Sequence, residues 1–225
     1  KTIRADLYAF SDQDDIWMSD KLERAVRYFD KNNESQLPIA YGTRTQIVDD
    51  ALKPLGLSPE FTLPCSFRNA LVQSISGGNT QVFNFVAKQL LEQAGLQKVI
   101  SHDWWLYQLV TGAGGIFHYD PVPSLLYRQH LDAVVGSNTS FRSKIERLHY
   151  VLNGRFKEWN YINYTALYSI RHLLSKENKD ILDILGRFSG AGLKDRLRLL
   201  NVTGLYRQTW HGNLSLWLAT IINKI

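Results

Sequence analysis

Three different residue patterns follow one another in the stretch Leu7-Tyr-Ala-Phe-Ser-Asp-Gln-Asp-Asp-Ile-Trp-Met-Ser-Asp-Lys-Leu-Glu-Arg-Ala-Val-Arg-Tyr-Phe29. Its apolar run over 7–10 is typical of a buried strand, and the run ends abruptly in a polar, acidic loop over 11–15. A helix is predicted from Asp20, which together with Glu23 resembles a capping box. The apolar residues that follow recur at helical spacing: Leu22, Ala25, Val26 and Phe29. A strand, an acidic loop and a helix therefore follow one another, as in an α/β protein.

The same alternation of short strands and helices continues to about residue 140. The stretch over 49–64, which contains Pro and Gly, is expected to be a loop. Strands are predicted over 39–48, 79–84, 116–119 and 125–128, and helices over 66–73, over 85–94 and from Asp103 to about 111. These elements predict a mixed sheet flanked by helices.

Beyond residue 140 the pattern is almost purely helical. The apolar residues at 3–4 spacing are Ile145, Leu148, Leu152, Phe156 and Trp159, then Leu167, Ile170 and Leu174, then Ile181, Leu182 and Leu185. Two further helical segments are expected over 193–200 and 205–222. With a boundary at 136–141, the chain divides into an α/β region, 1–138, and an all-α C-terminal extension, 139–225.

Composition narrows the possible classes of protein. The chain has 225 residues, of which 44% are hydrophobic, and this excludes a disordered or coiled-coil protein. The single Cys65 excludes an internal disulfide and a multi-cysteine zinc site. The only methionine is Met18, so we expect a fragment or a processed product. No apolar run is long enough to span a bilayer and no signal-peptide pattern opens the chain, which predicts a soluble or membrane-surface protein in a reducing compartment.

The net charge of +5 is concentrated in residues 186–225, which contain one acidic residue, Asp195. The basic residues there are Arg187, Lys194, Arg196, Arg198, Arg207 and Lys224. Together with apolar residues and the tryptophans Trp210 and Trp217, they predict a basic amphipathic region that lies on an anionic membrane surface. The alternative is a set of helices packed on the rest of the protein with a solvated basic face. No nucleic-acid-binding motif is present, and nucleic acid is not an expected partner.

The acidic loop is a candidate metal site. Asp12, Asp14 and Asp15 place three carboxylates within four residues, where they repel one another unless a cation lies between them. Mg²⁺ and Mn²⁺ prefer such oxygen ligands, and substrate phosphates often complete their coordination. The alternative is a solvated loop in which the aspartates cap turns.

The segment Tyr8–Glu23 resembles the FSDQDDIW…KLE segment of family 2 glycosyltransferases, especially their rhamnosyltransferase-like members. The resemblance implies a GT-A fold in which Asp12 and Asp14 form the DXD motif that binds Mg²⁺ or Mn²⁺ on the donor's diphosphate. It also places Gln13 at the donor and Trp17 at the acceptor. Family members begin with a strand–helix–strand unit that holds the nucleotide, so the resemblance implies a GT-A domain that lacks this N-terminal part.

A second match covers the segment Ser101–Leu106, which resembles the family element whose aspartate is the catalytic base. The resemblance assigns that role to Asp103 and places His102 and Trp104 at the acceptor. A carboxylate suits the chemistry, because an inverting sugar transfer needs a group that accepts the proton of the attacking hydroxyl. The alternative interpretation of Asp103 is a helix N-cap.

A third match, Tyr127-Arg-Gln-His130, is similar to the family's YRxH element. It implies that Arg128 contacts the donor diphosphate and that His130 is a further metal ligand or contacts the leaving pyrophosphate. A basic strand end facing solvent is the alternative. In the loop over 76–80, Gly78 and Asn79 resemble the glycine-containing loop beside the donor sugar.

These matches predict an inverting, metal-dependent glycosyltransferase that acts in cell-surface polysaccharide synthesis. The expected donor is dTDP-rhamnose, with a uridine-diphosphate sugar second, and the expected acceptor is a glycan or a lipid-linked glycan at the cytoplasmic face of the membrane. One alternative is a non-catalytic membrane-surface or scaffold domain with a glycosyltransferase fold. A phosphotransfer enzyme of the haloacid-dehalogenase type also has DxD after a strand. That type has Thr or Val soon after the second aspartate, whereas Asp15-Ile-Trp17 follows here.

Overall fold

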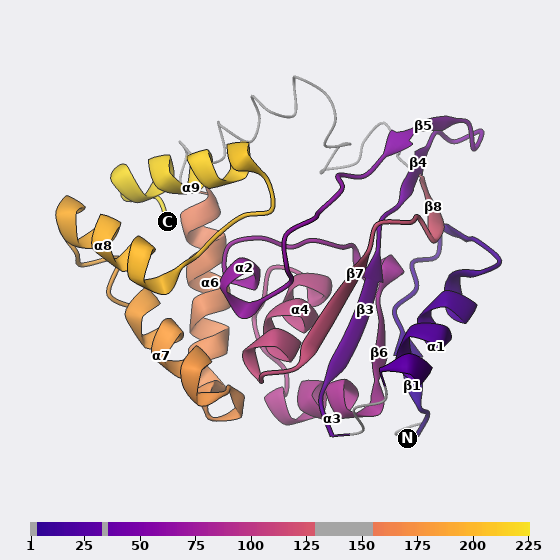
Figure 1. The fold of residues 1–225 in the computed structure, drawn as a ribbon, viewed down its shortest axis with the longest axis horizontal. Helices are drawn as coiled ribbons and strands as arrows, with labels where there is room; N and C mark the ends of the chain where they lie inside the picture. Colours follow the sequence, from indigo (N-terminus) through magenta and orange to yellow (C-terminus); the bar gives the residue numbers. More distant parts are fainter. Residues whose placement is uncertain (1–3, 33–35, 129–154) are drawn as a thin grey trace.

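The computed structural model describes residues 4–32, 36–128 and 155–225. Within these residues the chain forms two mixed β-sheets flanked by helices, followed by a helical C-terminal region (Figure 1). The predicted α/β class with an all-α extension is confirmed, and the arrangement is consistent with a GT-A-like fold. The predicted boundary at 136–141 and the predicted helical residues Ile145, Leu148 and Leu152 lie outside the described residues.

The first sheet has the strand order β1-β6-β3-β7. Its strands are β1 (Leu7–Ala9), β6 (Val82–Asn84), β3 (Ile39–Thr43) and β7 (Ile116–Asp120). Only β3 and β7 run parallel in it, while β6 is antiparallel to both of its neighbours. The acidic loop therefore begins where β1, an edge strand of this sheet, ends.

Side chains of the first sheet alternate between two apolar layers, as the two-residue period of a strand requires. Tyr41 and Val82, which lie opposite each other, pack on one face with Ala25 of α1 (Lys21–Lys31). Their neighbours Ala40 and Phe83 pack on the other face with helices α3 (Phe85–Ala94) and α4 (His102–Gly112). The sheet is thus buried on both sides, which explains its largely apolar strands.

The second sheet was only partly predicted. Its order is β2-β8-β4-β5, with strands β2 (Ile16–Trp17), β8 (Leu125–Arg128), β4 (Gln46–Val48) and β5 (Pro54–Leu57). The single strand predicted over 39–48 is wrong, because β3 and β4 belong to different sheets. The loop predicted over 49–64 contains β5, which forms a hairpin with β4. Strand β2 was missed, and it pairs antiparallel with β8.

Three helices lie behind the first sheet: α2 (Phe67–Ala70), α3 (Phe85–Ala94) and α4 (His102–Gly112). The bounds predicted for α3 are confirmed. The Asn84 side chain accepts a hydrogen bond from the Ala87 N–H at 2.9 Å, and Gly95 ends the helix with a φ of +65°. The capping box predicted at the start of α1 is wrong, because the Asp20 side chain caps no backbone N–H.

The C-terminal region consists of α6 (Arg155–Ser169), α7 (Lys176–Leu185), α8 (Leu193–Thr203) and α9 (Trp210–Ile221). The last helix begins at Trp210 rather than at the predicted 205. Thr209 precedes it, and its hydroxyl accepts a hydrogen bond from the Gly212 N–H at 3.1 Å. Of the described helices, none is both long and apolar enough to cross a bilayer.

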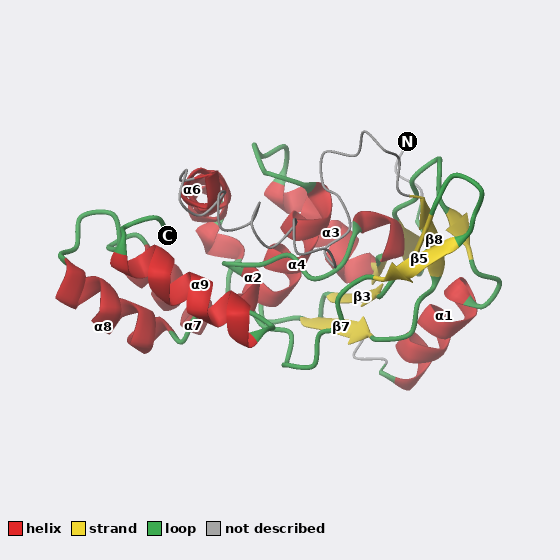
Figure 2. Ribbon diagram, turned by 90° about the horizontal axis from the view of Figure 1, so that it is seen from above, coloured by secondary structure: helices red, strands yellow, loops and turns green. Residues whose placement is uncertain are grey.

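Helix α4 joins the two regions, because it lies between the first sheet and the C-terminal helices (Figure 2). Its Leu106 and Val110 pack toward the sheet, while Trp105 and Leu109 pack into a second core. That core contains the C-terminal residues Leu167, Leu182, Leu200, Leu205 and Leu216 together with Phe67 of α2. The C-terminal helices therefore pack on the α/β region, as the second interpretation of the tail predicted.

Candidate functional site

The acidic loop connects β1 to β2 and presents most of its polar side chains to solvent. Asp12, Gln13 and Asp14 are exposed. Asp15, which comes next, is only half-exposed because it turns toward the loop that precedes β6. The four residues thus divide into an outer group of three and one inward carboxylate.

Asp15 joins three segments that are far apart in the sequence. One of its carboxylate oxygens accepts a hydrogen bond from the Asn79 side-chain amide, and the other accepts the Arg128 backbone N–H at 3.4 Å. Burial raises the pKa of Asp15, while the bonds from Asn79 and Arg128 oppose this shift and the nearby charges of Asp14 and Asp12 add to it. The acidic loop, the glycine loop and the end of β8 therefore meet at this carboxylate.

Lys21, the first residue of α1, lies in the same network, a position that its sequence did not predict. Its side chain is 1% exposed, and its ammonium donates a hydrogen bond to the Asn79 carbonyl oxygen. The same nitrogen lies 3.9 Å from the centroid of the Trp17 ring. Burial lowers the pKa of Lys21 to about 8, against the attraction of Asp15 and Asp12. Asn79 is thereby held from both sides, by a carboxylate and by an ammonium.

The glycine loop touches the start of α4. Asn79 is 3% exposed, and a Cβ atom at Gly78 would collide with the imidazole of His102. The His102 ring also packs edge-on against Phe10 at the end of β1, with 4.7 Å between the ring centroids. Only a glycine at position 78 permits this close approach.

Asp103 lies in the first turn of α4 and is half-buried. The N-cap position is Ser101, so the N-cap interpretation of Asp103 is wrong. Its backbone carbonyl accepts a hydrogen bond from the Gln81 side chain at 3.3 Å. Its Oδ1 atom is buried and has no hydrogen-bond partner among the residues that the structure describes. A buried carboxylate oxygen without a protein partner is unusual, and a ligand that reaches it would supply the missing hydrogen bond.

The two tryptophans predicted at the acceptor differ in position. Trp17 is half-exposed beside Lys21. Trp104 is 4% exposed, and its indole N–H donates to the Ala70 carbonyl at 2.7 Å. Trp104 is therefore a core residue at the contact between α4 and α2, and this position gives no support to an acceptor contact.

At the end of β8, Arg128 is half-buried, and its guanidinium donates to the Asp50 carbonyl at 3.1 Å. Its Nε atom is buried without a hydrogen-bond partner in the described structure. The arginine is thus not simply a solvated strand end. His130, the predicted further metal ligand, lies outside the described residues.

The fit of a divalent cation depends on the outer aspartates. Across 4–32, 36–128 and 155–225, no three His, Cys, Asp or Glu side chains are grouped as metal ligands. Asp15 already accepts hydrogen bonds from Asn79 and Arg128. Asp12 and Asp14 remain as exposed oxygen donors, and Mg²⁺ is commonly held by one or two carboxylates with substrate phosphates. The donor set therefore fits a cation only when a phosphate ligand completes its coordination.

The structure thus brings together the acidic loop, Gly78, Asn79, His102 and the end of β8. Lys21 was not predicted as a site residue. The signal that could have indicated it is its position in the Lys21-Leu-Glu23 triplet, which belongs to the segment that resembles the glycosyltransferases. Asp15 was recognised as a member of the acidic loop, but its role as the link to Asn79 was not.

Comparison with known proteins gives one informative similarity. The chain is 30% identical over 158 residues to a Shigella flexneri protein named dTDP-rhamnosyl transferase RfbG. The match covers 68% of this chain and 53% of that protein, so this chain spans about half the length of its relative. No family model matches the chain. This similarity supports a relationship with glycosyltransferases.

Proposed function

We propose that this chain belongs to an inverting, metal-dependent glycosyltransferase of the hexosyltransferase type. It would move rhamnose from dTDP-rhamnose to a glycan or lipid-linked acceptor in cell-surface polysaccharide synthesis. The observation that carries the proposal is the convergence of the acidic loop, the glycine loop and β8 on Asp15 and Asn79. The similarity to a dTDP-rhamnosyl transferase gives it independent support.

In this proposal the exposed carboxylates of Asp12 and Asp14 hold Mg²⁺ or Mn²⁺ together with the donor's diphosphate. When bound there, such a cation would offset the negative charge of the leaving diphosphate. Asn79 and Gly78 would lie beside the donor, in a loop that hydrogen bonds of Asn79 with Asp15 and Lys21 hold in place. His130 is proposed as an additional ligand from the segment that follows β8.

Asp103 would act as the general base. Its carboxylate takes the proton of the acceptor hydroxyl while that oxygen forms a bond to the anomeric carbon. The bond from the anomeric carbon to the diphosphate oxygen breaks on the opposite side, and its electron pair leaves with the nucleotide. The configuration at the anomeric carbon is thereby inverted. The guanidinium of Arg128, whose Nε has no protein partner among the described residues, would offset the charge that develops on the diphosphate.

Donor binding tests the proposal. We expect titration calorimetry with Mn²⁺ present to detect dTDP-rhamnose binding, and Asp14→Asn to weaken it at least about tenfold because a cation ligand is lost. The matched control is Asp180→Asn, an exposed aspartate of α7, a helix that lies on the opposite side of the molecule from β1 and α1 (Figure 1). Binding that is unchanged in Asp14→Asn, or that needs no divalent cation, would contradict the metal assignment. A preference for a uridine-diphosphate sugar would contradict the choice of donor.

A further inference from the structure

The side chain of Gln81 is enclosed between the glycine loop and helix α4. Gln81 follows that loop directly, precedes β6 and is 0% exposed. Its amide nitrogen donates hydrogen bonds to the Ser76 hydroxyl at 3.0 Å and to the Ser76 carbonyl at 3.3 Å. The same nitrogen donates to the Asp103 carbonyl at 3.3 Å. One buried amide thus joins the glycine loop to the first turn of α4.

These contacts determine which way the Gln81 amide points. Carbonyl oxygens only accept hydrogen bonds, so the amide nitrogen, and not the amide oxygen, must face the carbonyls of Ser76 and Asp103. The Oε1 atom is left buried, with no hydrogen-bond partner among the residues that the structure describes. An apolar side chain of similar shape would fill this space without burying such an oxygen. Packing alone therefore does not explain a glutamine at this position.

The backbone of Gln81 contacts the segment that leads into the acidic loop. Its carbonyl accepts a hydrogen bond at 3.3 Å from the N–H of Phe10, the residue that follows β1. The acidic loop over 11–15 begins directly after Phe10. Gln81 therefore binds the start of the acidic loop through its backbone, and the turn that carries Asp103 through its side chain.

The first turn of α4 depends on contacts from outside the helix. The first N–H groups of a helix have no partner within it, and an N-cap side chain often supplies one. At α4 the N-cap residue Ser101 makes no such side-chain hydrogen bond. The bond from Gln81 to the Asp103 carbonyl therefore ties this turn to the strand and the loop beside it.

We propose that Gln81 is a positioning residue that holds the Asp103 carboxylate at a set distance from the acidic loop. This role rests on the proposed function, in which the acidic loop holds the donor and Asp103 is the general base. Gln81 itself contacts neither donor nor acceptor in this proposal. A displacement of about 1 Å in a reacting group can lower a rate about a hundredfold, so a residue that joins the two halves of the site affects turnover.

Steady-state kinetics of Gln81→Met in the full-length protein test this role. Methionine keeps the length of the side chain and removes its amide. We expect kcat for rhamnosyl transfer to fall at least about tenfold, because the base is held less precisely. The donor KM, and the donor Kd from calorimetry with Mn²⁺, should stay within about threefold, since the backbone bond from Phe10 to Gln81 remains. An unchanged kcat, or a loss that appears in donor affinity instead, would overturn the proposal.

Gln108→Met is the matched control. Gln108 is also 0% exposed, and its Oε1 likewise has no partner within the described part of the chain. Its amide, however, donates to the Ala70 carbonyl of α2 at 3.1 Å. The control therefore measures the effect of removing a buried amide of α4 that does not bind Asp103. Equal losses of kcat in the Gln81 and Gln108 variants would overturn the proposal.

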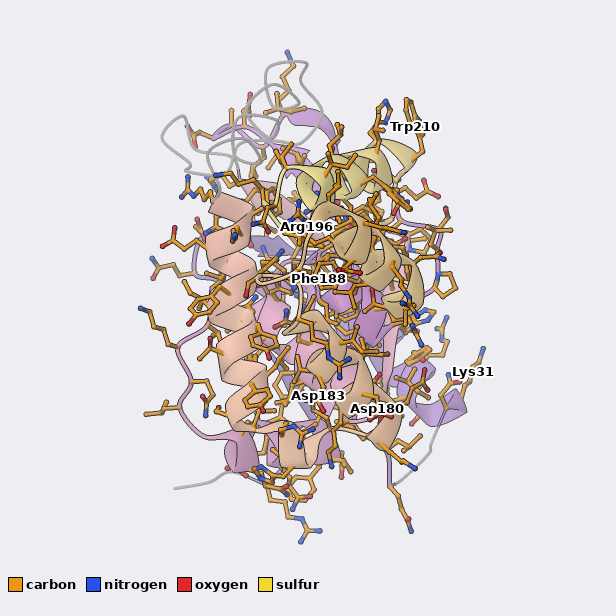
Figure 3. All side chains as sticks on the ribbon, turned by 90° about the vertical axis from the view of Figure 1, so that its left-hand side faces the viewer. Lys31, Asp180, Asp183, Phe188, Arg196 and Trp210 are labelled. Carbon is orange, nitrogen blue, oxygen red and sulfur yellow. The ribbon has the colours of Figure 1, made fainter. Side chains whose placement is uncertain are left out.

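A surface control is Asp180→Asn. Asp180 is an exposed residue of α7, on the side of the molecule that faces the viewer in Figure 3. This variant should leave kcat and the donor Kd unchanged, which sets the experimental scatter against which the loss in Gln81→Met is judged.

A double-variant cycle shows whether Gln81 acts through the base. In protein that carries Asp103→Asn, the further change Gln81→Met should lower kcat less than about twofold, because the group that it positions is already lost. Fully additive losses would assign Gln81 a general role in the fold and overturn the proposal. If circular dichroism shows that Gln81→Met does not fold, Ser76→Ala replaces it, because it removes one partner of the amide. Its kcat should fall about two- to fivefold at constant donor affinity, and an unchanged kcat would overturn the proposal.

The wild type separates this proposal from the proposed function. If it neither transfers rhamnose nor binds dTDP-rhamnose, the proposed function is wrong and the role of Gln81 is wrong with it. If it is active and keeps its kcat in Gln81→Met, only the role of Gln81 is wrong.

Discussion

The acidic site and α9 depart from ordinary globular packing in opposite directions. At the acidic site, polar groups are inside: Lys21, Asn79 and Gln81 are each at most 3% exposed. At α9, tryptophans and leucines are outside. A buried polar group must be compensated by partners, and the site supplies them through Asp15, Ser76 and the Asn79 carbonyl. The exposed apolar side chains of α9 have no such compensation within the described residues. The polar groups of the acidic site are thus paired within the described chain except at Gln81 Oε1, Asp103 Oδ1 and Arg128 Nε, whereas α9 leaves large apolar side chains in contact with solvent.

The largest expected effect is a loss of transfer activity in a variant of the acidic site that keeps its fold. Asp103→Asn removes the proposed proton acceptor while it keeps the shape of the side chain. The rate of rhamnosyl transfer should therefore fall about 10²–10⁴-fold. The measurement is transfer of radiolabelled rhamnose by the full-length protein, with Asp180→Asn as the control. Wild-type turnover by the Asp103 variant would exclude it as the base.

The next prediction compares a buried and an exposed leucine of α9, Leu216 and Leu214. Leu216→Ala should lower the free energy of unfolding by about 2–4 kcal/mol, because it leaves a cavity in the shared core. Leu214→Ala, two residues earlier, removes a side chain that is 52% exposed and should change it by no more than about 0.5 kcal/mol. Urea unfolding of both variants provides the comparison. An equal loss of unfolding free energy in both variants would mean that Leu214 is also packed in the protein.

A third prediction concerns the close contact between the glycine loop and α4. Gly78→Ala places a methyl group against the His102 ring and should destabilise the protein by about 1–3 kcal/mol. Gly190→Ala is the control, since no atom lies within 4 Å of a Cβ built there. Thermal unfolding that is the same for both variants would show that the loop does not rest on His102.

The smallest expected effect is a pH dependence that comes from Lys21. Its pKa in the folded protein is about 8, below its ordinary value of 10.5, so above about pH 8 the unfolded chain binds more protons than the folded protein. The free energy of unfolding of the wild type should therefore rise relative to that of Lys21→Met as the pH increases. The expected gain is roughly 1–2 kcal/mol between pH values of about 8 and 9.5. Urea unfolding measures it, and Lys31→Met at the exposed end of α1 is the control. A wild type that loses stability relative to Lys21→Met over this range would contradict the lowered pKa.

Much of the α/β region could be predicted from the sequence because its signals are local. Strand β1 ends where the apolar run meets the acidic loop, and α3 is bounded by Asn84 and Gly95. Strands β2 and β5 escaped prediction because both are short and exist through pairing with β8 and β4. The division of 39–48 between two sheets is likewise set by distant partners, β6 and β7 for one part and β8 and β5 for the other.

The site and α9 show where sequence patterns fail in this chain. The motifs predicted that the acidic loop, the glycine loop and the start of α4 act together, and the contacts of Asn79 and His102 are local consequences of that arrangement. A lysine at a helix start is ordinarily solvated, so nothing at Lys21 itself predicts burial against a loop 58 residues away. The apolar periodicity of α9 was visible, but periodicity cannot say which face turns inward when Arg196 and Leu216 determine the orientation.

The core shared by Phe67, Leu109 and Leu216 has a consequence for how the chain is made. A nascent chain leaves the ribosome from its N-terminal end, so α2 and α4 emerge well before α8 and α9 do. Until then, Trp105 and Leu109 of α4 lack the C-terminal side chains against which they pack in the folded protein. Contacts between residues so distant in sequence also slow folding, because a long loop must close first. Folding during synthesis should therefore pause with α4 half-covered and finish only after the last helices are released.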